Sequence, residues 1–145
     1  MKPVVGLIAL SVIMAMTAVD SRSQSVDTVR GVKATPAYEM LIVKRAALRT
    51  ELIEQREILT SQHPDVQHTN YELSILNNEI ERMLVNQSSQ ISKLSSVYGD
   101  LILRKINLQA GEHQLRSQVT STHPDLRKKR IEVAAIQQEI EDLLR

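Results

Sequence analysis

The tripeptide His-Pro-Asp occurs twice in this chain of 145 residues, at positions 63–65 and 123–125. When residues 38–85 are laid over residues 98–145 without a gap, 15 of the 48 positions are identical. Many other positions exchange like for like, such as Leu76 for Ile136. The chain therefore contains two copies of one structural unit, and this repeat constrains the fold more than any local signal does.

The apolar residues of the chain are almost all aliphatic, since it has three Tyr and neither Phe nor Trp. Aliphatic residues mixed with many Glu, Gln, Lys and Arg are typical of long helices and coiled coils. The net charge of +1 creates no global field toward nucleic acid. The lack of cysteine excludes disulfides, thiolate metal sites and cysteine nucleophiles.

Each unit carries apolar residues at alternating three- and four-residue spacing, which is the heptad pattern of a narrow helical seam. In the first unit the pattern follows a helix start signal, with Thr35 as N-cap and Pro36 at the first helical position. The predicted seam residues are Leu41, Leu48, Leu52, Leu59, Val66, Leu73, Leu76, Ile80, Leu101, Leu108, Leu115, Val119, Leu126, Val133, Ile136 and Ile140.

The repeated tripeptide predicts a turn between two helices. Proline disfavours helical geometry in the residue before it and suits the first turn of the next helix, where aspartate complements the helix dipole. Folding a unit about its tripeptide also brings Leu52 opposite Leu73, so the two arms match as an antiparallel hairpin. The predicted turn residues are His63, Pro64, Asp65, His123, Pro124 and Asp125. The sequence therefore predicts an all-α fold of two tandem antiparallel helical hairpins.

The N-terminal segment resembles a secretory signal peptide, because Lys2 precedes an uncharged run from Pro3 to Val19. The alternative is an uncleaved, slightly short membrane anchor, and then the membrane is contacted through this segment alone. Either form predicts a periplasmic or secreted protein. The expected divisions are 1–23 as signal peptide or anchor, 24–35 as linker, 36–87 as the first hairpin, 88–95 as a junction and 96–145 as the second hairpin.

The junction between the units allows two interpretations. It is rich in Ser, Asn and Gln, and Ser95 matches the N-cap Thr35 in the repeat, which favours a new helix starting there. Heptad spacing nevertheless continues through Ile91, Leu94 and Tyr98, as one unbroken helix would require. The repeat tips the prediction toward a break, and the continuous helix stays open.

The sequence predicts no catalytic, cofactor or metal site. The potential metal ligands lack a pair at i, i+4 spacing on one face with a third ligand nearby, so we interpret the histidines as turn and surface residues. The basic run 127–130 points around the whole circumference of a helix, which is typical of solvated charges and not of nucleic-acid binding. The ligand candidates considered are His63, Asp65, His68, His113, His123 and Asp125.

Each unit combines a leucine heptad helix, the turn Thr-Ser-x-His-Pro-Asp-Val/Leu and a helix that ends in Glu-Ile-Glu-x-x-Leu. This combination resembles the periplasmic coiled-coil hairpin of bacterial polysaccharide chain-length determinant and exopolysaccharide-export proteins. The likeness covers residues 38–84 and 98–144. No membrane-proximal α/β domain and no kinase domain accompany it here, so it implies an extracytoplasmic hairpin scaffold and does not imply chain-length control.

Two small hairpins without large aromatic residues bury little apolar area, so we expect a homo-oligomer or a partner coiled coil to complete the core. The predicted function is that of an exported, non-enzymatic scaffold or adaptor that acts through helix–helix contacts. One alternative is an accessory factor of envelope polysaccharide or efflux machinery. Another is a small periplasmic metal- or ligand-binding helical protein.

Overall fold

A computed structural model describes residues 26–86 and 88–145 of the chain. The predicted signal peptide, residues 1–23, lies outside these residues. Within them the regular elements are all helical, which confirms the all-α prediction. They include α2 (Pro36–Ile58), α3 (Pro64–Asn86), the short 3₁₀ helix η1 (Ser88–Lys93), α4 (Ser96–Arg116) and α5 (Pro124–Leu144). In this part of the chain, no helix combines the length and the hydropathy that crossing a membrane would require.

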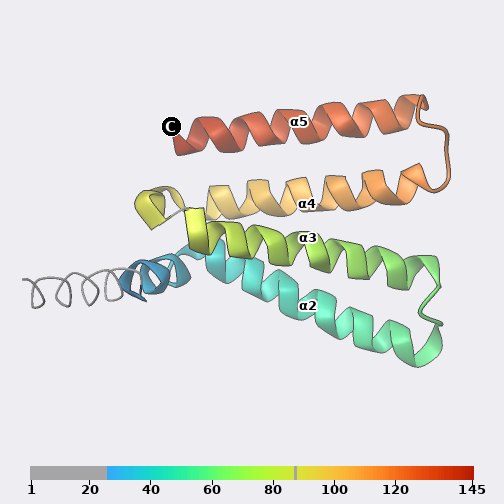
Figure 1. Cartoon of the computed structure of the whole chain (residues 1–145), viewed down its shortest axis with the longest axis horizontal. Coiled ribbons are helices and arrows are strands. Elements are labelled where there is room, and N and C mark those ends of the chain that lie inside the picture. Colours follow the sequence, from blue (N-terminus) through green and yellow to red (C-terminus); the bar gives the residue numbers. More distant parts are fainter. Residues whose placement is uncertain (1–25, 87) are drawn as a thin grey trace, which may run out of the picture.

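The four long helices run alongside one another as two antiparallel hairpins, α2–α3 and α4–α5 (Figure 1). Both hairpin turns lie at one end of the molecule, and η1 lies at the other end with the C-terminus. α4 packs on α2 and α3 as well as on α5, so α2, α3 and α4 form a three-helix bundle. α5 packs mainly on α4 and contacts η1, so it is the outermost helix of this layer.

Corresponding side chains begin corresponding helices in the two hairpins. The hydroxyl of Thr35 accepts a hydrogen bond from the Tyr38 N–H at 3.3 Å, and the hydroxyl of Ser95 accepts one from the Tyr98 N–H at 3.4 Å. Such bonds satisfy N–H groups that have no partner in the first helical turn. The sequence signal Thr35–Pro36 therefore marks the observed start of α2.

The two hairpin turns are built in the same way. α2 ends at Ile58 and α3 begins at Pro64, while α4 ends at Arg116 and α5 begins at Pro124. In each turn the histidine Nδ1 accepts a hydrogen bond from the aspartate N–H two residues later, at 3.3 Å. The chain thus turns at both tripeptides, and the histidine ring caps the helix that the proline opens.

The segment 24–35, expected to be a linker, is helical over residues 26–33. Val32 is fully buried there, and Val29 is half-buried. This short helix lies so close to the junction that a Cβ on Gly31 would be 2.9 Å from Ile91 Cδ1. The expectation of a linker is therefore corrected, because the three-residue spacing of Val26, Val29 and Val32 places Val32 against the core.

The junction between the hairpins is a break and not a continuous helix. α3 ends at Asn86, and η1 contains non-helical backbone at Gln90 before Leu94 and the N-cap Ser95. Leu94 is 1 % exposed, so the break inserts an apolar side chain into the core. The heptad spacing of Ile91, Leu94 and Tyr98 would suit one continuous helix. It reflects the burial of Leu94 and not an unbroken helical backbone.

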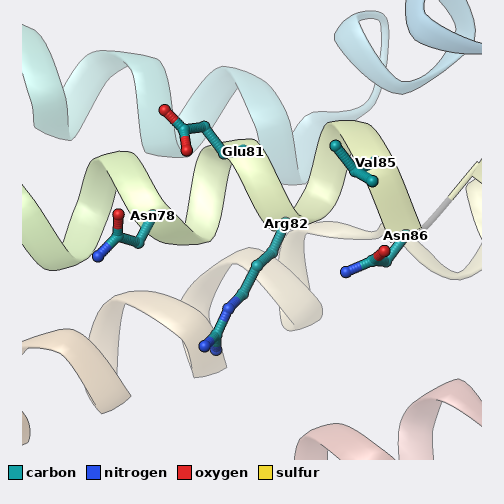
Figure 2. Close-up of a pocket in the computed structure, with 5 residues that line it drawn as sticks. All are labelled: Asn78, Glu81, Arg82, Val85 and Asn86. Carbon is teal, nitrogen blue, oxygen red and sulfur yellow. The ribbon is translucent and has the colours of Figure 1, made fainter.

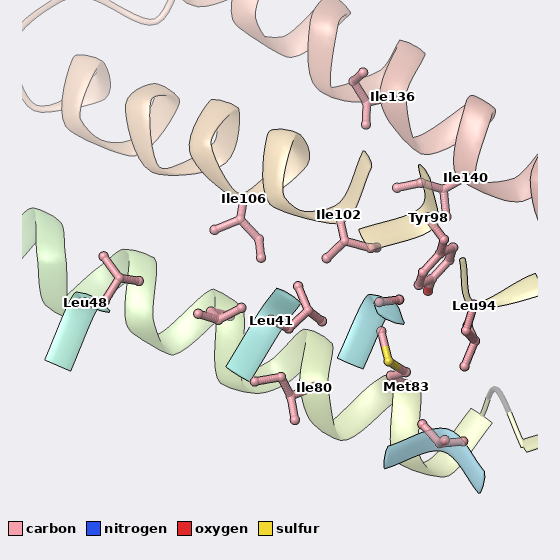
Figure 3. Packing of buried hydrophobic residues seen from close by; sticks show 13 residues of the cluster. Leu41, Leu48, Ile80, Met83, Leu94, Tyr98, Ile102, Ile106, Ile136 and Ile140 are labelled. Carbon is pink, nitrogen blue, oxygen red and sulfur yellow. The ribbon is translucent and has the colours of Figure 1, made fainter. Parts of the chain in front are cut away.

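The core runs along the three-helix bundle and extends to the near side of α5 (Figure 3). Tyr98, Ile102 and Ile106 of α4 occupy its centre, with Ile136 and Ile140 of α5 on one side. On the other side lie Leu41 and Leu48 of α2 and residues of α3. Both hairpins therefore share one hydrophobic core, which α4 joins together.

The predicted seam residues differ in how deeply they lie. α4 buries Tyr98 and Lys105 at the edge of its predicted seam, and Ile102, Ile106 and Ala110 on a face turned away from it. The helix is rotated in this way because it must cover hairpin 1 as well as α5. The buried seam residues are Leu41, Leu48, Leu52, Val66, Leu76, Ile80, Leu126, Ile136 and Ile140, and the half-buried ones are Leu59, Leu73, Leu101, Leu108, Leu115, Val119 and Val133.

Candidate functional site

An ion pair inside the molecule connects the two hairpins. Lys105 Nζ of α4 lies 2.8 Å from Glu79 Oε1 of α3, and both residues are buried. Lys105 also donates a hydrogen bond to Gln137 Oε1 of α5 at 3.3 Å. A buried charge is costly unless it is paired and hydrogen-bonded. This cluster therefore binds α3, α4 and α5 to one another at one fixed register.

A pocket of about 260 Å³ lies beside this ion pair, where α3, α4 and α5 meet. Tyr98 forms part of its wall. Burial of the ring, together with the negative charge of Glu79, raises the pKa of Tyr98 to about 12. The phenol therefore stays neutral at any physiological pH. The remaining lining residues are Arg82, Asn86, Ile102, Lys105, Gln137, Ile140, Glu141 and Leu144.

A second ion pair joins the two helices of hairpin 1. Lys44 Nζ of α2 lies 2.8 Å from Glu72 Oε1 of α3, and His68 Nε2 lies 3.9 Å from the other oxygen of the same carboxylate. Glu72 is buried, whereas Lys44 and His68 are half-buried. This cluster holds α2 on α3 in the same way that Lys105 and Glu79 hold the two hairpins together.

Glu112 holds the two helices of hairpin 2 near their turn. Its Oε1 accepts hydrogen bonds from Arg116 Nη2 at 2.7 Å and from Arg130 Nε at 3.0 Å. Burial alone would raise the pKa of Glu112, but the two guanidinium groups outweigh it and lower the pKa below its ordinary value. Folding the second unit about Pro124 would bring Lys129 near Glu112 across the seam. Arg130 is the actual partner, and Lys129 Nζ instead lies over Gly111.

The histidines do not gather at one place. His63 and His123 lie beside Asp65 and Asp125 in their own turns, with Nδ1–Oδ2 distances of 3.6 and 3.8 Å. His113 of α4 stacks on Tyr71 of α3, with ring centroids 3.8 Å apart and an angle of 17° between the planes. Among the described residues, no group of three or more His, Cys, Asp or Glu side chains could hold a metal ion.

Another hollow, of about 400 Å³, lies along the surface of α3 (Figure 2). Its lining residues, Asn78, Glu81, Arg82, Val85 and Asn86, all come from this one helix. Figure 2 shows Arg82 reaching toward α4, while Glu81 lies on the other side of the helix. Because one helix supplies every wall, this hollow is a feature of the outer surface and not an enclosed binding site.

Sequence reasoning missed the most buried of these polar contacts. Lys105 stands at an apolar phase of the heptad pattern in the second unit, but its carboxylate partner belongs to the other hairpin. The signal was a charged residue at an otherwise apolar phase, which indicates a buried partner without saying which helix supplies it. The polar groups inside the molecule can therefore fix how its helices are placed on one another.

No protein-family model, no curated protein and no solved structure matches this chain. The resemblance of the two units to the coiled-coil hairpin of polysaccharide chain-length determinants therefore stays a prediction from their heptads and their repeated turn.

Proposed function

We propose that this protein is an exported, non-enzymatic scaffold or adaptor that acts through helix–helix contacts. One observation carries the proposal. The buried charges join helices to one another, while large aliphatic side chains remain on the outer faces of the molecule. Val43, Ile53 and Ile131 are 70, 62 and 61 % exposed. Covering such side chains with a partner helix removes apolar area from water and favours association.

The proposed place of action is outside the cytoplasm. The uncharged run that ends at Val19 supports export, because its length suits the apolar part of a secretory signal. The resemblance of both hairpins to periplasmic coiled coils supports a role beside envelope polysaccharide or efflux machinery. In such a role the protein would present rigid helix faces to a partner and would transfer no chemical group.

Export is tested by fusing the full-length chain to a reporter that is active only outside the cytoplasm. We expect the full-length fusion to be active and a fusion without residues 1–23 to remain in the cytoplasm. In the control fusion, a signal peptide that is known to export the same reporter replaces residues 1–23. This control shows that the rest of the chain can be exported. Equal export with and without residues 1–23 would contradict the proposal.

The scaffold function itself is tested by measuring helicity and melting temperature over a wide range of protein concentration. A chain whose outer faces need a partner gains stability by mass action, so we expect both quantities to rise with concentration. A melting temperature that does not change with protein concentration, but rises when a divalent metal is added, would show the opposite pattern. That result would favour the small metal- or ligand-binding helical protein instead.

A further inference from the structure

Within one molecule, hairpin 2 packs on hairpin 1 through the face of α4 that looks away from its own hairpin partner. Three contacts define this internal interface. Lys105 pairs with Glu79 at 2.8 Å, and the ring of His113 stacks on Tyr71. At the third contact the helices approach so closely that a Cβ on Gly99 would lie 3.1 Å from the Cα of Ala37. The interface joins two different surfaces, one on each hairpin.

The sixty-residue repeat gives both surfaces a second copy at the outside of the molecule. The positions equivalent to Lys105 and His113 are Arg45 and Ile53 on α2. Those equivalent to Glu79 and Tyr71 are Glu139 and Ile131 on α5. The repeat thus replaces the Lys–Glu pair by an Arg and a Glu, and the stacked rings by two isoleucines.

Ile53, the equivalent of His113, lies on a face of α2 that packs on no described helix, which we call the outer α2 face. Val43 and Ile53 are 70 and 62 % exposed, and Ala46 and Thr50 between them are exposed as well. Their three- and four-residue spacing makes one stripe along the helix, opposite the leucines that pack on α3. Arg45 is half-buried at the edge between this stripe and the buried leucines, and it has no ion-pair partner among the described residues.

The equivalent surface of hairpin 2, which we call the receiving face, is equally uncovered. On α5 it contains Ile131, which is 61 % exposed, and the exposed residues Ala135 and Glu139. On α4 it contains Val97, which is 57 % exposed at the position where hairpin 1 has the fully buried Ala37. Glu139 makes no ion pair within the described residues, so this face offers an unpaired carboxylate beside exposed aliphatic side chains.

We propose that copies of this chain assemble head to tail, with the outer α2 face of one copy docked on the receiving face of the next. Arg45 then pairs with Glu139 of the neighbouring copy, as Lys105 pairs with Glu79 inside one molecule. Ile53 packs on the neighbour's Ile131 where His113 meets Tyr71. The inference rests on the proposed scaffold function and names its partner as a second copy of the same chain.

One difference between the repeats shapes the contact. Glu39 stands where α4 has Gly99, so the close approach of helices at that point cannot be repeated between copies. The contact between copies therefore centres on Arg45 and Ile53, nearer the hairpin turns. Because the two faces differ and each molecule carries both, the assembly grows beyond a dimer, as heterologous contacts form rings or filaments.

The absence of cysteine from the sequence makes the proposal testable by crosslinking in cells that express the full chain. We introduce Ile53→Cys and Ile131→Cys together and treat the cells with a short bifunctional maleimide. The expected result is a ladder of crosslinked multimers. Co-expression of two chains that each carry one of these cysteines should give crosslinked dimers and nothing larger, and either chain alone should stay monomeric.

The matched control combines Ile53→Cys with Val85→Cys, because Val85 is 73 % exposed but belongs to neither face. It should give no ladder. Dimers from Ile53→Cys alone would overturn the proposal, since they indicate a symmetric contact of two α2 helices. Crosslinks from position 53 to a different protein would also overturn it but would leave the adaptor function standing. A lack of any crosslinked protein would count against both.

Charge reversal provides the second measurement. Arg45→Glu in the double-cysteine chain should reduce the ladder at least roughly tenfold, because like charges then face each other across the contact. Glu139→Arg should do the same, and the two reversals in one chain should restore the ladder. Glu81→Arg is the control, since Glu81 is exposed on α3, which carries neither of the two faces. If the yield of crosslinked multimers stayed the same after these reversals, the proposed pairing would be overturned.

Discussion

α2 and α4 occupy the same place in the repeat, yet they bury different faces. α2 buries Leu41, Leu48 and Leu52, which pack on its hairpin partner α3. α4 instead buries Ile102 and Ile106, together with Lys105, Tyr98, Gly99 and Ala110. α2 has its hairpin partner on one side and a free outer face on the other, whereas α4 lies between hairpin 1 and α5. The neighbours of a helix, and not its heptad phase alone, therefore decide which residues become core.

The second helices of the two hairpins, α3 and α5, show the same effect in their polar residues. α3 buries Thr69, Glu72 and Glu79, whereas the equivalent residues of α5 are half-buried or exposed. Sequence identity at Glu79 and Glu139 thus produces an internal ion pair in one hairpin and a free surface charge in the other. A residue that recurs in the repeat therefore makes the same contact only where its surroundings recur as well.

The largest difference between the hairpins should appear at their equivalent cations. Lys105→Met leaves the buried Glu79 with the mostly exposed Arg82 as its nearest cation, and breaking a buried pair costs roughly 3–5 kcal/mol. Arg45→Met should change the free energy of unfolding by less than about 0.5 kcal/mol in the monomer. Denaturant unfolding at low protein concentration measures both. Similar losses at the two positions would mean that Lys105 is not inside the core.

The second prediction concerns the buried face of α4. Leu48→Ala and Ile106→Ala should each cost roughly 2–5 kcal/mol, because both side chains are almost fully buried. Leu108→Ala should cost about half as much, since Leu108 is half-buried although it is the repeat equivalent of Leu48. Arg56→Ala is the exposed control. If Leu108→Ala proved as costly as Leu48→Ala, α4 would have the same buried face as α2.

The third prediction uses the pH dependence of stability. The pKa of Tyr98 rises from 10.0 to about 12 on folding, so the folded state keeps a proton that the unfolded state loses above pH 10. Stability from this residue is present below pH 10 and is lost as the pH rises toward 12, at up to about 1.4 kcal/mol per pH unit. Tyr98→Phe should flatten this alkaline loss in denaturant titrations, whereas Tyr38→Phe, the half-buried equivalent, should leave it in place. An unchanged slope in Tyr98→Phe would place the phenol in contact with water.

The smallest effects should come from the two glycines of α4. Gly111→Ala places a methyl group against the flexible end of Lys129, so the gain in helix propensity should stabilise the protein by up to about 1 kcal/mol. Gly99→Ala brings the methyl group against Met40 and the backbone of Ala37 and should cost about 1–2 kcal/mol net. Thermal melts of both variants measure the difference. Stabilisation by both substitutions would mean that α2 and α4 can separate at no cost.

Local chemistry explains what the sequence could predict. Proline geometry and N-cap preferences act within a few residues, so Thr35, Pro64 and Pro124 predicted where helices begin, and Ser95 favoured the break before α4. The heptads of hairpin 1 also predicted its buried leucines, because α2 packs on α3 along that seam.

The remaining features depend on contacts between distant segments, which no local pattern specifies. The rotated face of α4 follows from packing on hairpin 1, and the partner of Lys105 lies in a different unit of the repeat. Arg130 replaced Lys129 as the partner of Glu112 because a shift of one residue turns a side chain by about 100° around a helix. Residues 26–33 are helical because Val32 fits the shared core, although the surrounding sequence is polar.

The outermost position of α5 has a consequence for hydrogen exchange. α5 is held by α4 on one side and, at its end, by Lys93 and Gln90, which donate to the Leu144 carbonyl at 2.6 and 3.1 Å. Separating it exposes less apolar surface than unfolding the three-helix bundle, so its amides exchange through a partial opening that leaves α2, α3 and α4 folded. A neighbouring copy bound to α5 would slow that exchange. The exchange rate of the α5 amides therefore reports whether the molecule is a monomer or part of an assembly.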